Sequence, residues 1–145
     1  FFTERDIVWT IQKLLINHCD LKNIYSIYND YGILPSNNIN AKRKLSSDLV
    51  IVNNETKKVE LVIEFKYEPS HKRTDIMKNK FPVINFNGVL KDIKKIETIK
   101  QKFLSNSVIS ILFDENLSFK SLFEKNKLYP EIISNQYVDI YIIKK

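Results

Sequence analysis

Polar and apolar residues alternate along the middle of the chain. Between Glu60 and Glu68 the even-numbered positions are mostly charged, whereas the odd-numbered positions carry only large apolar side chains. Because successive side chains of a strand point to opposite faces, this pattern predicts a strand with one buried face. A β-prone run at 47–52 precedes it, and the polar segment 53–58 between the two runs is typical of a turn. We therefore predict a β-hairpin.

The remaining patterns predict helices on either side of this hairpin. Thr3 is a suitable N-cap for a helix that ends near His18, and Asn87 for a second helix over 89–104. Further expectations are a strand at 24–28, a loop at 31–47, an extended segment at 81–86, and then a strand, a helix and a strand at 108–113, 118–127 and 137–143. This order predicts a single α/β domain over 1–145, with a central mixed sheet flanked by helices.

The hairpin brings charged residues together if its register is in phase. With Val52 opposite Glu60, Asp48 lies opposite Glu64, and Lys66 follows on the same face. A shift of one residue would turn Asp48 to the other face. Two facing carboxylates repel unless a cation lies between them, and oxygen ligands are those that Mg²⁺ prefers. The sequence therefore predicts a Mg²⁺ site in which Mn²⁺ substitutes.

Each of these features also has a structural interpretation. Glu64 and Lys66 alone are typical of a solvated strand face, and it is Asp48 opposite them that favours a site. The lysines of the 89–104 helix, including Lys95, are interpreted as a solvated face. Trp9 lies off the apolar stripe of the first helix, and we expect it to pack against the protein rather than to stack on a base.

Composition narrows the classes of function. The 145 residues carry a net charge of +6, which favours a polyanionic partner to a moderate degree. One cysteine excludes an internal disulfide and a cysteine-based cluster, and two glycines leave no P-loop. No apolar run has the length of a membrane span, and we expect a cytoplasmic protein.

The order of elements, with Asp48 before the hairpin and Glu64-Phe65-Lys66 after it, resembles the PD-(D/E)XK nuclease superfamily. This resemblance implies the restriction-endonuclease-like αβββαβ core. Glu4 in the first helix matches a glutamate that many members place near the metal. Ser47 stands where the superfamily name has proline. Gln101 has no tyrosine four residues later, and the cysteine cluster of Cas4-like members is absent, so the branch is undetermined.

The resemblance implies a mechanism for hydrolysis of phosphodiester bonds. Asp48 and Glu64, helped by the carbonyl of Phe65, would hold Mg²⁺, which contacts a phosphate oxygen and lowers the pKa of a bound water. Lys66 would orient the attacking hydroxide or stabilise the charge of the transition state. Glu4 would bind a metal through water, or a second metal directly.

The implied substrate is nucleic acid, with DNA favoured over RNA and neither excluded by the sequence. Basic residues flank the hairpin region, and we predict that they contact phosphates without reading bases; they are Lys42, Arg43, His71, Lys72 and Arg73. A homodimer is compatible with the way small nucleases of this fold cut both strands. Two alternatives stay open, namely a non-catalytic nucleic-acid-binding module within a larger assembly and a partner-binding domain without nucleic acid.

If this hypothesis holds, Lys66→Ala should abolish Mg²⁺-dependent cleavage of DNA while leaving the fold intact, because Lys66 acts on the transition state. A cleavage assay beside a circular-dichroism spectrum measures both properties. Full activity of the variant would remove Lys66 from the mechanism.

Overall fold

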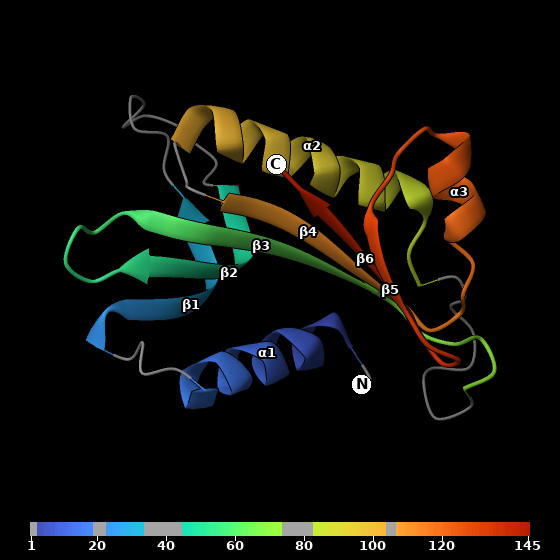
Figure 1. Ribbon diagram of the computed structural model, residues 1–145, viewed down its shortest axis with the longest axis horizontal. Coiled ribbons are helices and arrows are strands. Elements are labelled where there is room, and N and C mark those ends of the chain that lie inside the picture. The colour runs from blue at the N-terminus through green and yellow to red at the C-terminus, as the bar shows by residue number, and fades with distance from the viewer. Residues whose placement is uncertain (1–2, 19–22, 34–44, 74–82, 104–106) are drawn as a thin grey trace.

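Six strands form one mixed sheet between two long helices in the computed structural model (Figure 1). The structure describes residues 3–18, 23–33, 45–73, 83–103 and 107–145. The strands are β1 (Tyr25–Ile33), β2 (Leu45–Asn53), β3 (Val59–Glu68), β4 (Ser107–Asp114), β5 (Glu131–Ser134) and β6 (Asp139–Lys144). The helices are α1 (Glu4–His18), α2 (Phe86–Phe103) and α3 (Lys120–Lys125). The α/β class and the αβββαβ order are both confirmed.

The sheet has the order β1-β2-β3-β4-β6-β5. β1, β2 and β3 form an antiparallel meander, and α2 then crosses over to β4, which pairs parallel to β3. A parallel pair needs such a crossover because its second strand must start at the same end as the first. β6 pairs antiparallel to β4, and the short strand β5 forms the far edge. The sequence pattern had not predicted β5.

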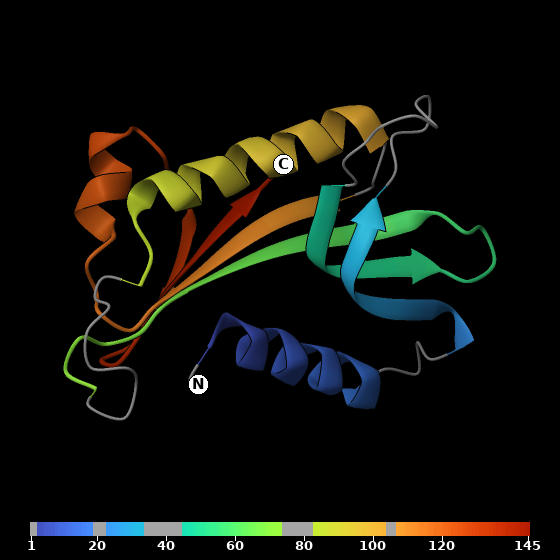
Figure 2. The same ribbon diagram turned by 180° about the vertical axis from the view of Figure 1, so that it is seen from behind.

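Helices cover both faces of β3 (Figures 1 and 2). Phe65 and Tyr67 of β3 lie in one apolar cluster with Ile7 of α1, whereas Val62 lies in a second cluster with Ile96 of α2. The prediction that only one face is buried is therefore wrong. Glu64, on the face that α2 covers, is only 2% exposed. The charged positions of the alternating pattern mark buried polar groups rather than a solvated face.

The hairpin register agrees with the sequence prediction at its centre. Val50 lies opposite Val62 as expected. A bulge between Ile51 and Val52 then places Val52 opposite Val59 instead of Glu60. The bulge lies on the turn side of that pair, so the register towards Asp48 keeps the predicted phase.

β2 leaves β3 at Asp48. The last paired residues of these two strands are Leu49 and Ile63. The β1–β2 ladder is also interrupted here, because Asp30 has φ of 49° and is skipped together with Asp48. Aspartate tolerates this left-handed conformation better than most residues. Figure 2 shows both strands turning sharply. Asp48 lies next to Leu49, where the pairing of β2 with β3 ends.

The helix starts follow from capping. Thr3 caps α1 as predicted, since its N–H donates to Asp6 Oδ2 at 2.7 Å and the Asp6 N–H approaches Thr3 Oγ1 at 3.4 Å. α2 begins at Phe86, and its cap is Asn85, whose Oδ1 accepts the Gly88 N–H at 3.0 Å. The predicted cap at Asn87 is therefore wrong. No described helix combines the length and the apolar composition that crossing a lipid bilayer demands.

We expect Asn85→Ala to lower the free energy of unfolding by about 1 kcal/mol, because it removes the side-chain acceptor of the Gly88 N–H. The matched control is Asn87→Ala, inside the first turn of α2 and exposed. Urea denaturation of both variants measures the difference, and equal stabilities would contradict Asn85 as the cap.

Candidate functional site

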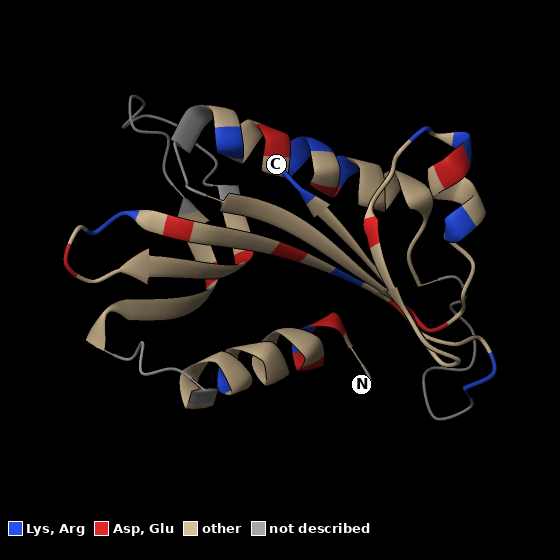
Figure 3. Ribbon diagram, in the orientation of Figure 1, with Lys and Arg blue, Asp and Glu red and all other residues tan. Residues whose placement is uncertain are grey.

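Six ionisable side chains gather where β2 leaves β3, and we call them the charged cluster. They come from α1, β2, β3 and α2, and are Glu4, Asp48, Glu64, Lys66, Asp92 and Lys95. Figure 3 shows acidic and basic segments along β3 beneath α2, and the acidic first turn of α1. The three residues that the hairpin pattern nominated all belong to this cluster, and so does Glu4.

Asp48 is held by the backbone of β3. Its Oδ2 accepts the Phe65 N–H at 2.7 Å. Because β2 has left β3 at this point, the carboxylate takes the place of a strand carbonyl and satisfies a backbone donor. The negative charge of Asp48 also raises the pKa of Glu64, as expected for carboxylates that share one face. Asp48 thus joins the bend of the sheet to the charged cluster.

Glu64 is a buried carboxylate with one cationic partner. Its Oε2 accepts a hydrogen bond from Lys95 Nζ at 2.6 Å, while its Oε1 is buried without a hydrogen-bond partner in the part of the chain that the structure describes. Burial, followed by the charge of Asp48, raises the pKa of Glu64 to about 7, although Lys95 and the hydroxyl group of Ser47 oppose the shift. Glu64 is therefore poised to accept a further cation or donor.

Lys66 Nζ lies among three oxygen acceptors. It donates to Phe65 O at 3.1 Å and to Glu4 Oε2 at 3.3 Å, and it lies 3.1 Å from Asp92 Oδ2. Burial alone would lower the pKa of Lys66, but the charges of Asp92 and Glu4 outweigh it, and the pKa is raised. Lys66 therefore stays an ammonium ion at neutral pH.

Asp92 and Lys95 are site residues that the sequence analysis missed. The interpretation of Lys95 as part of a solvated face is wrong, because 25% of its side chain is exposed and it pairs with Glu64. Asp92 is more deeply buried, and burial raises its pKa while Lys66 opposes that shift. Both residues share the stripe of Ile96 at helical spacing, and this signal could have revealed them.

A pocket of about 110 Å³ adjoins the charged cluster on the α1 side. Its described lining residues come from α1 and from the bend of β1 and β2, and are Glu4, Arg5, Val8, Trp9, Asn29, Asp30 and Asp48. Trp9 is 58% exposed, so the expectation that it packs against the protein is wrong. Asp48 and Glu4 therefore face a space that a ligand can enter.

The oxygen atoms of the charged cluster are of the chemical types that bind Mg²⁺. Two carboxylates, Asp48 and Glu64, and the Phe65 carbonyl are the ligand types that this ion takes, and Glu64 Oε1 is a buried acceptor without a partner. In the arrangement observed, ammonium groups contact Glu64 Oε2 and Phe65 O. Among the described residues, no three acidic, histidine or cysteine side chains converge as a metal-binding group. Glu4 thus contacts Lys66 without completing a third carboxylate ligand.

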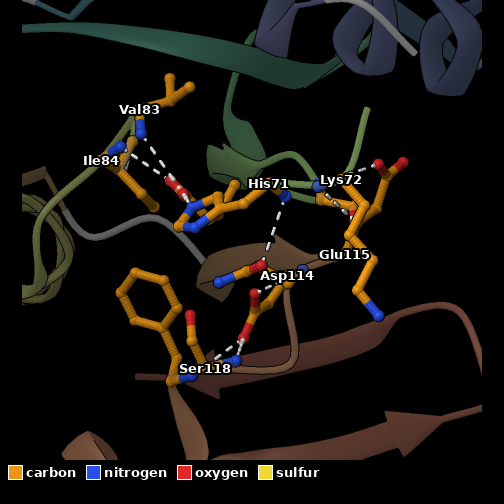
Figure 4. A network of polar contacts seen from close by, with 11 residues as sticks. His71, Lys72, Val83, Ile84, Asp114, Glu115 and Ser118 are labelled. Atoms are coloured by element: carbon orange, nitrogen blue, oxygen red, sulfur yellow. Dashed lines mark hydrogen bonds and ion pairs between the residues drawn. The ribbon is translucent and has the colours of Figure 1, made fainter. Parts of the chain in front are cut away.

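His71 belongs to a second polar network, at the carboxyl ends of β3 and β4 (Figure 4), and Arg73 joins it through Glu115. His71 Nε2 bonds Glu68, which is fully buried, and Arg73 Nη1 pairs with Glu115 Oε2 at 3.4 Å. Glu68 also accepts hydrogen bonds from the backbone N–H groups of Val83 and Ile84. This network joins the segment after β3 to the start of α2 and the segment after β4.

The structure therefore describes only three of the five residues that were predicted to contact phosphates. Lys72 is exposed, whereas His71 and Arg73 make bonds within the protein. Lys42 and Arg43 lie outside the described residues. The role of all five basic residues in nucleic-acid binding stays a prediction.

Comparison of the chain with family models, with curated proteins and with solved structures finds no match. Functional inference therefore depends on the geometry of the charged cluster and its pocket. The resemblance to PD-(D/E)XK nucleases therefore depends only on the residues and the order of elements that suggested it.

The raised pKa of Glu64 predicts a pH-dependent stability. The pKa of the Glu64 carboxyl group is 4.5 in the unfolded chain and about 7 in the folded chain. The free energy of unfolding therefore falls as the pH rises between these values. Glu64→Gln should therefore gain stability relative to the wild type between pH 4.5 and 8, by about 3 kcal/mol at most. Urea denaturation at both pH values measures this gain. A difference that is the same at both would refute the shift.

Proposed function

We propose that the protein is a Mg²⁺-dependent endonuclease that hydrolyses phosphodiester bonds in DNA, as the PD-(D/E)XK nucleases do. The main support is the gathering of Asp48, Glu64 and Lys66 at the bend of β2, next to an open pocket. Structural ion pairs are usually found on the protein surface. Glu64, by contrast, is buried, and its Oε1 has no hydrogen-bond partner among the described residues. Burying an incompletely satisfied charge opposes folding, and such a cost is typical of functional sites.

In this proposal, Asp48 and Glu64 hold the ion together with the Phe65 carbonyl. Bound Mg²⁺ supplies an activated water and a Lewis acid for the phosphate. The bond between Asp48 and the Phe65 N–H fixes one carboxylate before the substrate arrives. Lys95 offsets the charge of Glu64 on the side of α2.

Lys66 acts in this proposal as a permanent cation. Its raised pKa keeps the ammonium protonated, so it stabilises negative charge on the transferring phosphate rather than accepting a proton. Asp92 is a positioning residue, because it holds the ammonium from the side of α2. Glu4 holds it from α1, which is the simplest role that its contacts support.

A non-catalytic nucleic-acid-binding module is the second candidate. One observation favours it: Lys66 and Lys95 already satisfy acceptors that a metal would use. In such a module the two lysines would be structural partners of the carboxylates, and the net charge of +6 would support binding. Only the dependence of cleavage on the carboxylates separates the two candidates.

Asp48→Asn should lower nicking of a supercoiled plasmid in Mg²⁺ or Mn²⁺ by at least about 100-fold. The amide keeps an acceptor for the Phe65 N–H but removes the charge that holds the ion, so the fold should be retained. The matched control is Lys94→Ala, an exposed α2 residue beside Lys95, which should cut like the wild type.

Three results discriminate the candidates. Metal-dependent nicking that is lost in Asp48→Asn and kept in Lys94→Ala supports the nuclease. DNA binding that weakens with added salt, without cutting by any protein, supports the module. Equal cutting by Asp48→Asn and the wild type would overturn the proposed role of the cluster.

A further inference from the structure

The single tryptophan of the chain lies on the rim of the pocket beside Asp48. Its neighbours Ile7 and Val8 point into the core, whereas 58% of Trp9 is exposed. A single exposed apolar side chain is ordinary on a protein surface and suggests no function by itself. Trp9 differs because it shares a pocket with Glu4 and Asp48 of the charged cluster.

Asn29 supplies a fixed polar group to the same pocket. Its Nδ2 donates to Gln12 Oε1 at 2.6 Å, and Gln12 Nε2 donates to Ile27 O at 3.3 Å, so this chain of bonds sets the orientation of the amide. Asn29 Oδ1 is buried and has no hydrogen-bond partner among the described residues. A buried acceptor of this kind opposes folding unless a ligand or a water donates to it.

The charges of the pocket select the part of a nucleotide that it can take. Asp30 and the two carboxylates of the cluster disfavour a phosphate inside it, but they accept hydrogen bonds from the amino groups of cytosine, adenine or guanine. Arg5 is the basic residue among the described lining residues; its Nη2 lies 4.0 Å from Asp30 Oδ2, and both side chains are mostly exposed, at 69% and 76%. A base edge therefore suits the interior, and a phosphate suits the rim at Arg5.

We propose that this pocket binds one unpaired, amino-bearing nucleobase of the substrate, stacked on Trp9 with its amino edge towards Asn29 Oδ1. The inference rests on the proposed function, and it defines the substrate class as single-stranded or locally unpaired nucleic acid. In a duplex the base is paired and stacked, so it must first be displaced to reach the pocket. Thymine has no amino group and fits less well.

The fluorescence of Trp9 reports on this site directly, because the chain has no other tryptophan. The wild-type protein is titrated with dC, dA and dT 12-mers and with a duplex in Ca²⁺, and a gel checks that the strands stay intact. We expect dC and dA to quench the emission at lower concentration than dT or the duplex. Anisotropy of labelled strands measures binding independently of the tryptophan.

Three variants test the stacking. Trp9→Ala should weaken binding of the dC 12-mer about 10-fold, and Trp9→Phe less than 3-fold, because base–aromatic stacking needs a ring face. Tyr137→Ala is the matched control, since Tyr137 is an exposed aromatic residue that is not among the lining residues of the pocket. It should bind like the wild type.

The outcomes separate this inference from the proposed function. The base site would be overturned if the oligonucleotides bind, as measured by anisotropy, without changing Trp9 emission and bind Trp9→Ala equally well. The nuclease proposal would then still stand. Quenching of Trp9 emission without any cleavage in Mg²⁺ supports the base site and overturns the proposal that the protein is a nuclease. Absence of binding to every strand would overturn both.

Discussion

The burial of opposite charges between β3 and α2 is the constraint on which the arrangement of the site depends. Glu64 and Lys66 lie two residues apart on the strand, and neither can be covered by a helix unless the helix supplies a partner. Lys95 meets Glu64, and Asp92 meets Lys66. The two pairs run in opposite chain directions, as expected for a crossover helix that returns antiparallel to the strands it joins. The charges thus fix the register of α2 on the sheet, where apolar contacts alone would tolerate sliding.

The bend at Asp48 is the second determinant of the site. A regular three-stranded meander would pair Asp48 within the ladder and close the space beside it. The left-handed conformation of Asp30 and the absence of β2–β3 pairing at Asp48, just before Leu49, prevent this closure. The carboxylate then satisfies the Phe65 N–H and faces the pocket. One local irregularity therefore produces both a half-buried acidic group that faces the pocket and the space that a substrate would enter.

The sequence predicted those parts of the fold that depend on local pattern. The hairpin, the phase of Asp48 against Glu64 and the cap at Thr3 follow from alternation and turn chemistry. Two features were missed because they depend on tertiary contacts. Helical spacing places Lys95 on the buried side of α2, but its pairing with Glu64 is not visible until α2 is placed over β3. The bend at Asp30 depends on backbone geometry that no hydrophobic pattern encodes.

The long chain separations inside the charged cluster have a consequence for the order of folding. Glu4 and Lys66 are 62 residues apart, and Glu64 and Lys95 are 31 apart, so neither contact forms within a local segment. The antiparallel meander can form early from neighbouring segments, whereas these contacts must wait until both helices dock. We expect the site to be assembled last and to be lost first on mild heating.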